Sequence, residues 1–195
     1  MVVVLENGET WGIATQTGTN PSAGALYGNT TSSGTTLSGT GSQFNLVSGT
    51  VTSASYAGTF VAKSSITVNL SDGSTFNGTY NPEYDQPASL AALAGTFSGG
   101  GLTRNSSALV SVTVDPSGAI TVPISQGCSA SGTATPRPSG KNVFNVTVTF
   151  NGTSCALGDG TSTSGIALYE STSRSLLLWA LNGATSDGFI FGGGK

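Results

Sequence analysis

The chain has no histidine among its 195 residues, and charged residues make up only 8% of it, against about 25% in an average soluble protein. Without an imidazole, the sequence lacks the usual base of Ser-His-Asp and Cys-His catalysis and the commonest metal-ligating side chain. The six basic residues are scattered, so there is no basic patch for nucleic acid or an anionic membrane. Two cysteines without histidine do not make a four-ligand zinc site, and no phosphate-binding glycine motif is present. We therefore expect no cofactor, no metal site and no nucleic-acid partner.

Long apolar runs are also missing. No stretch approaches the roughly 18 apolar residues of a membrane-spanning helix. The run Val2-Val3-Val4-Leu5 after Met1 is too short for a signal peptide and has no basic segment before it. Our hypothesis is that Met1 replaces an export signal that has been removed, and a gene without an upstream signal would contradict it.

Hydroxyl residues and glycine are abundant where charged residues are few, with 29 glycines, 29 serines and 28 threonines. Hydrophobic residues still make up 36% of the chain, which argues against disorder. In the segment 142–150, Phe144, Val146, Val148 and Phe150 occupy every second position. A period of two places them on one face of a β-strand and the intervening hydroxyl and amide side chains on the other. This alternation is typical of antiparallel sheets with one face in water.

Similar runs recur between turn signals such as Asn7-Gly8, Asp72-Gly73 and Asp115-Pro116-Ser117-Gly118. In the first half we expect strands at Val2–Glu6, Thr10–Thr15, Gly24–Thr30, Thr36–Gly41, Gly49–Ala54, Tyr56–Ala62, Ser65–Leu70 and Ser74–Tyr80. In the second half we expect them at Gly95–Ser98, Ser107–Val114, Gly118–Ile124, Cys128–Ala134, Asn142–Phe150, Thr163–Tyr169, Ser175–Leu181 and Asp187–Phe191.

The strand pattern stops at 81–87, where two prolines exclude the interior of a strand. Ala88–Leu93 is the one segment with helical character, and Asp85 is its predicted cap. The sequence thus predicts an all-β protein of two antiparallel β lobes joined by a short helix. We expect an N-terminal lobe at 1–82, a connector with the helix at 83–93 and a C-terminal lobe at 94–195. The second lobe is expected to be an up-and-down eight-stranded barrel or a sandwich.

Cys128 and Cys155 lie in Ser/Thr-rich strand and turn sequence. They are compatible with a disulfide or with two buried free thiols. We favour the disulfide because the composition is that of an exported protein. On the chain-entropy model this bridge would stabilise the fold by about 3.6 kcal/mol.

Paired carboxylates are the one catalytic arrangement that the composition leaves open, because glycoside hydrolysis needs two of them. Glu6 and Glu9 flank a turn, and Glu83 and Asp85 flank Tyr84. The alternative interpretation is that these are solvated turn residues, a loop charge and a helix cap. Trp11 and Trp179 are candidates for stacking on sugars or bases, although their strand patterns favour core packing.

Three residues are candidates for contact with a partner. Tyr84 lies in the connector, where its ring is expected to be exposed. Arg137 lies between two prolines, and Lys141 follows closely. These two cations are either solubilising charges at a hairpin tip or an anchor for an anionic partner.

The segments 84–99 (YDQPASLAALAGTFSG), 135–150 (TPRPSGKNVFNVTVTF) and 182–195 (NGATSDGFIFGGGK) resemble a family of uncharacterised exported lipoproteins of Gram-negative bacteria. The resemblance implies an upstream signal peptide with a lipid-modified cysteine, the Cys128–Cys155 pair, and, for some members, surface antigens. The two-lobed layout is also similar to factor-H-binding and transferrin-binding surface lipoproteins, an architectural likeness that does not carry function.

We therefore expect a non-enzymatic, monomeric ectodomain at the outer membrane surface or in the periplasm. It would bind an unknown protein, with a host protein as one candidate, or a glycan, and would reach the membrane only through a lipid anchor. The alternatives are a carbohydrate-binding module or carboxylate-dependent glycosidase, and a structural envelope protein.

Overall fold

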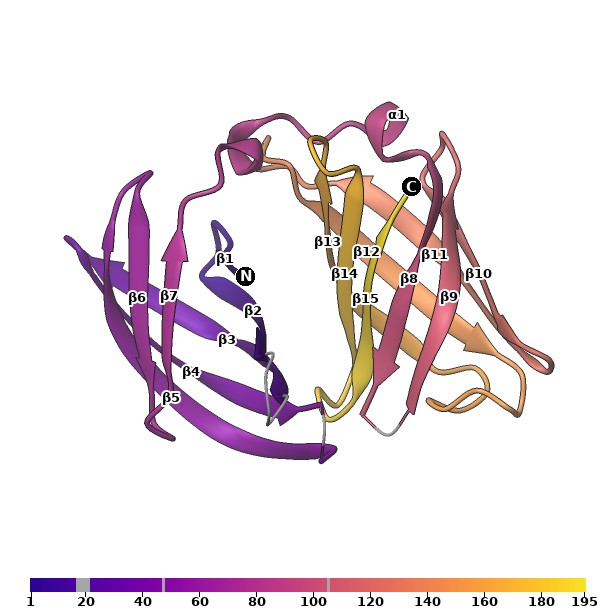
Figure 1. The fold of residues 1–195 in the computed structure, drawn as a ribbon, viewed down its shortest axis with the longest axis horizontal. Coiled ribbons are helices and arrows are strands. Elements are labelled where there is room, and N and C mark those ends of the chain that lie inside the picture. The colour runs from indigo at the N-terminus through magenta and orange to yellow at the C-terminus, as the bar shows by residue number, and fades with distance from the viewer. Residues whose placement is uncertain (17–21, 47, 105) are drawn as a thin grey trace. The chain divides into compact units, whose positions relative to one another are not determined.

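The computed structural model describes residues 1–16, 22–46, 48–104 and 106–195, and it divides the chain into two compact units, Met1–Pro82 and Glu83–Lys195. Both units consist of antiparallel β-strands (Figure 1), which confirms the predicted all-β fold. No helix in these described ranges is long and apolar enough to cross a membrane.

The first unit is a single seven-stranded sheet in which each strand pairs with the next in sequence, and it curls into a half-barrel (Figure 1). Its strands are β1 (Val2–Val4), β2 (Glu9–Gln16), β3 (Ser22–Ser33), β4 (Thr36–Asn45), β5 (Thr50–Val61), β6 (Ser65–Leu70) and β7 (Thr75–Thr79). The two strands predicted at Gly49–Ala54 and Tyr56–Ala62 form one continuous strand, β5, because it pairs with β4 along its first ten residues.

One face of this sheet carries an apolar cluster of five buried residues. They are Leu26, Leu37, Ala54, Tyr56 and Val68. A line of hydroxyl groups accompanies the cluster, since Thr30 Oγ1 lies 2.6 Å from Thr10 Oγ1 and 3.0 Å from the Tyr56 hydroxyl. These hydrogen bonds compensate the burial of three polar side chains.

The second unit contains a closed eight-stranded barrel, which resolves the predicted choice between barrel and sandwich. Its strands are β8 (Gly95–Thr103), β9 (Ser106–Val114), β10 (Ala119–Ser125), β11 (Cys128–Pro136), β12 (Phe144–Asn151), β13 (Ser162–Glu170), β14 (Ser175–Asn182) and β15 (Gly188–Gly194). Neighbours in sequence are neighbours in the barrel, and β15 closes it by pairing with β8.

Alternating side chains fill the barrel interior, as the sequence predicts. In β12, Phe144, Val146, Val148 and Phe150 are buried in the core cluster, while exposed or half-buried polar residues separate them. Aromatic rings meet edge to face inside, for example Phe150 and Phe189, whose centres are 5.7 Å apart. Burial of such rings is the main stabilising contribution in a core of this kind.

The closing strand pair is built from glycine. Gly99, Gly100 and Gly101 of β8 pair with Gly193, Gly192 and Phe191 of β15. A β-carbon added at Gly99 would lie 2.1 Å from the Gly192 carbonyl oxygen, so the two backbones approach too closely there for any larger residue. The strands expected to end at Ser98 and Phe191 therefore continue into the glycine runs.

Connections between strands use glycine with positive φ. After Asp115, Gly118 has φ 89°, its N–H donates to the Asp115 carbonyl, and the Asp115 N–H donates to the Ala119 carbonyl. Asp115 Oδ1 also accepts hydrogen bonds from the N–H and hydroxyl of Ser117. The predicted turn at 115–118 is thereby confirmed.

Candidate functional site

The connector between the β7 and β8 strands begins with a 3₁₀ turn, Pro82–Asp85, and ends with the helix α1, Leu90–Leu93. The N-cap of α1 is Ser89, whose hydroxyl accepts a hydrogen bond from the Ala92 N–H. The prediction that Asp85 caps this helix was wrong. The helix starts later than Ala88, and Asp85 makes an ion pair instead.

Glu83 holds the turn between β13 and β14. Its carboxylate accepts hydrogen bonds from the N–H of Ser171 at 2.5 Å and of Thr172 at 3.0 Å, and from the Thr172 hydroxyl. These hydrogen bonds, led by the one from the Thr172 hydroxyl, hold the pKa of Glu83 below its ordinary value. A general acid in glycoside hydrolysis needs a raised pKa, so this carboxylate is tuned in the opposite direction.

Tyr84, Asp85 and Lys141 lie together. Lys141 Nζ is 2.7 Å from Asp85 Oδ1 and 5.9 Å from the centre of the Tyr84 ring. The hydrogen bond to Asp85 is the largest cause of the raised pKa of Lys141. The Asn142 N–H donates to the Tyr84 carbonyl at 3.0 Å, which attaches the connector to the start of β12.

Arg137 lies in the same β11–β12 connection as Lys141. Its Nη1 donates to Asn145 Oδ1 at 2.6 Å, and its own carbonyl accepts from the Gly140 N–H. We call Tyr84, Asp85, Arg137 and Lys141 the connector cluster. All four residues are half-buried, so each contributes part of its side chain to the surface. Their role in partner contact stays a prediction.

The other predicted candidates occupy structural positions. Glu9 accepts a hydrogen bond from the Tyr27 hydroxyl at 3.3 Å and belongs to the β1–β2 hairpin. The centres of the Trp11 and Tyr27 rings are 4.5 Å apart. Trp11 and Trp179 are both buried, but neither belongs to the apolar cluster of the sheet or to the barrel core described above. In the described ranges, no group of three or more Cys, Asp or Glu could hold a metal ion.

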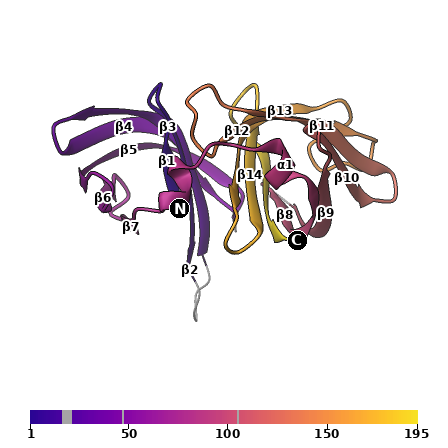
Figure 2. The ribbon, with the colours of Figure 1, turned by 90° about the horizontal axis from the view of Figure 1, so that it is seen from above.

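The helix α1 and the C-terminal end of the described chain lie at one end of the barrel, and Figure 2 looks onto this end. Leu93 of α1 is buried in the barrel core. Lys195 Nζ donates to the carbonyls of Ala92 and Ala94, at 2.7 and 2.9 Å, and lies 4.6 Å from the centre of the Tyr169 ring. A cation at the C-terminus of a helix and over an aromatic face is favourable on both counts.

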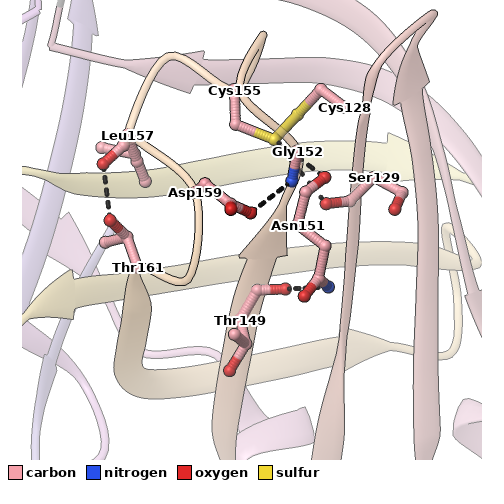
Figure 3. The surroundings of a disulfide bond; sticks show 9 residues. All are labelled: Cys128, Ser129, Thr149, Asn151, Gly152, Cys155, Leu157, Asp159 and Thr161. Atoms are coloured by element: carbon pink, nitrogen blue, oxygen red, sulfur yellow. Dashed lines mark hydrogen bonds between the residues drawn. A yellow bond between two sulfur atoms is a disulfide. The ribbon is translucent and has the colours of Figure 1, made fainter.

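The disulfide Cys128–Cys155 is formed, with 4.9 Å between the two α-carbons (Figure 3). It ties the start of β11 to the loop that follows β12. Inside this loop Asp159 accepts a hydrogen bond from the Gly152 N–H at 2.6 Å. Cys155 is part of the barrel core, and Leu157 packs against that core.

The sequence prediction of the disulfide is confirmed. A buried bond of this kind is typical of an oxidising, extracytoplasmic compartment. No protein-family model, curated protein or solved structure matches the chain. The eight-stranded barrel and the half-barrel agree only in broad layout with two-lobed surface lipoproteins.

Proposed function

We propose that this chain is the non-enzymatic ectodomain of a bacterial lipoprotein of the cell surface or periplasm, held there by a lipid anchor, and that it binds a partner through its outer surface. The observation that carries the proposal is the filled barrel interior. Large side chains such as Phe97, Phe144 and Phe191 are fully buried inside it. The proposal therefore places binding on an outer surface and not inside the barrel.

The acidic residues support the same proposal. Glu83 holds a turn through three hydrogen bonds, and Asp85 pairs with Lys141. Both carboxylates therefore serve the attachment of the connector, which weighs against the glycosidase alternative. Binding through the connector cluster would use the Tyr84 ring and the Arg137 cation beside the Lys141–Asp85 ion pair, and these groups suit an anionic or aromatic patch on a partner protein.

A pull-down with the oxidised chain, from serum and from cell-envelope extract, tests the proposal. We expect a discrete, stoichiometric partner whose capture falls when Tyr84→Ala and Arg137→Ala are combined. Arg104→Ala is the matched control, since Arg104 is exposed in the β8–β9 connection of the same unit. No captured partner from either source would contradict the proposal and favour a structural envelope protein.

Hydrolysis is tested separately by release of reducing sugar from a panel of polysaccharides. We expect none. Release that disappears in both Glu83→Gln and Asp85→Asn would overturn the non-enzymatic assignment.

A further inference from the structure

The seven-stranded sheet carries an open depression of about 650 Å³ across β3, β4, β5 and β6. Its volume is in the range of small-molecule sites in proteins, roughly 300–1,000 Å³. Polar side chains in its lining include those of Asn29, Ser38, Thr40, Ser55, Asn69 and Ser71, beside the apolar residues Ala57 and Leu70, and we call this depression the amide groove.

Strand register explains why these side chains share one face. Asn29 pairs with Thr40, and Thr40 pairs with Ser55, which gives one row across three strands. Ser38 pairs with Ala57, and Ala57 pairs with Asn69, which gives a second row beside the first. On β5, Ser55 and Ala57 alternate with Ala54 and Tyr56 of the apolar cluster. The amide groove therefore lies on the opposite face from that cluster.

The lining contains no charged side chain. Hydroxyl and side-chain amide groups can each both donate and accept hydrogen bonds, and so can the hydroxyl groups of a sugar. The polar side chains named for the groove are exposed. The Thr75 hydroxyl donates to Asn69 Oδ1 at 2.9 Å, so the Asn69 amide nitrogen points away from Thr75. A phosphate or sulfate would need cations, which the lining lacks. Ala57 and Leu70 lie among the polar groups, and such a mixed lining suits a sugar, which presents both hydroxyl groups and C–H groups.

We propose that the amide groove binds a short neutral oligosaccharide. The bound chain would run across the strands, with its hydroxyl groups paired to Asn29 and Asn69 at the two sides of the groove and to Thr40 and Ser55 between them. This site lies in the first unit and goes beyond the proposed function, because a partner held by the connector cluster requires nothing of it.

The test is a nuclear magnetic resonance titration of the ¹⁵N-labelled, oxidised full chain. The probes are short cello-, malto-, manno- and chito-oligosaccharides at millimolar concentration, with a heparin oligosaccharide as the charged comparator. We expect saturable shifts confined to β3–β6 with at least one neutral probe and none with heparin. The proposal would be overturned by any of three results: no chemical-shift change with the four neutral probes, changes outside β3–β6, or an equal response to heparin.

Single-residue variants test whether the probe binds in the amide groove. Asn29→Ala should weaken binding about 2- to 10-fold, the effect of one lost hydrogen bond. Ser55→Tyr should fill the groove and abolish the shifts. Thr59→Tyr is the matched control, since Thr59 is exposed on the same face of β5 but does not line the groove, and it should bind normally. Equal loss in Ser55→Tyr and Thr59→Tyr, with far-ultraviolet circular dichroism unchanged, would refute the assigned location. A negative titration leaves the pull-down result standing, so the two proposals fail separately.

Discussion

The glycine pair that closes the barrel gives the sharpest stability prediction. A β-carbon at Gly99 would lie 2.1 Å from the Gly192 carbonyl oxygen and 2.4 Å from the Gly193 α-carbon. Ordinary contact begins at 3.4 Å, so the Gly99→Ala substitution needs a relative shift of about 1.3 Å between β8 and β15. Both obstructing atoms are backbone, and no side-chain rotation relieves the contact.

We expect Gly99→Ala to destabilise the barrel by about 2–3 kcal/mol, the upper part of the range for overpacked positions. In a unit of this size that corresponds to a fall of roughly 8–15 °C in the melting temperature. Gly100 is the matched control, because it is the next residue of the same strand and an added β-carbon there meets nothing within 4 Å. Gly100→Ala should change stability by less than about 1 kcal/mol, and in the stabilising direction, since alanine restricts the unfolded chain more.

Differential scanning calorimetry of the full chain measures both variants. The barrel transition is recognised as the one that shifts when the Cys128–Cys155 disulfide is reduced, because that bond lies in the barrel unit. Equal melting temperatures for Gly99→Ala and Gly100→Ala would refute the close approach of β8 and β15.

Three further predictions concern the attachments of the barrel. Replacing Cys128 and Cys155 by serine should lower the free energy of unfolding in guanidinium by about 3–4 kcal/mol. Thiol titration of the unsubstituted chain, denatured but not reduced, should find no free thiol. Because its pKa is lowered, ionised Glu83 stabilises the fold at pH values above the ordinary carboxyl pKa, and this stabilisation is lost as the pH falls through the lowered pKa. The amide chemical shift of Thr172 should follow the titration of Glu83, and the Glu83→Gln variant should lack this pH dependence. Lys195→Met keeps an unbranched side chain but removes its charge. This substitution should lower the free energy of unfolding by about 1–2 kcal/mol and speed up amide hydrogen exchange in α1. Unchanged exchange would refute the capping role of Lys195.

Much of the barrel could be predicted because strands such as β12 alternate strictly between buried and more exposed residues. The β12 strand shows this best, since every second residue from Phe144 to Phe150 is apolar and buried. The continuation of β8 through Gly99–Gly101 could not be predicted, because glycine ordinarily weakens strands and marks turns. Only the approach of β15 shows that glycine is required there, and that contact joins residues nearly a hundred positions apart.

The sequence names Tyr84, Arg137 and Lys141 as candidates one by one, Tyr84 for its place in the connector and the other two for their charge. It does not predict that Tyr84 and Lys141 meet, which the structure shows. Their contact with a partner stays a prediction. The partner of Lys141 could not be foreseen, because Asp85 appeared to be a helix cap in the sequence. The amide groove was missed because its residues are common Ser, Thr and Asn, and their meeting depends on the register of four strands.

Cross-strand hydroxyl pairs on the barrel exterior lead back to the proposed function. Thr96 and Thr113 lie 3.0 Å apart through their Oγ1 atoms, as do Thr133 and Thr147. Such exposed pairs exchange hydrogen bonds with water at little net gain, so they explain little of the stability. Lysine and glutamate at the same positions would serve solubility equally well. Folding and solubility alone therefore do not require an exterior rich in uncharged hydroxyl groups, and the proposed function, recognition of a partner, would account for it.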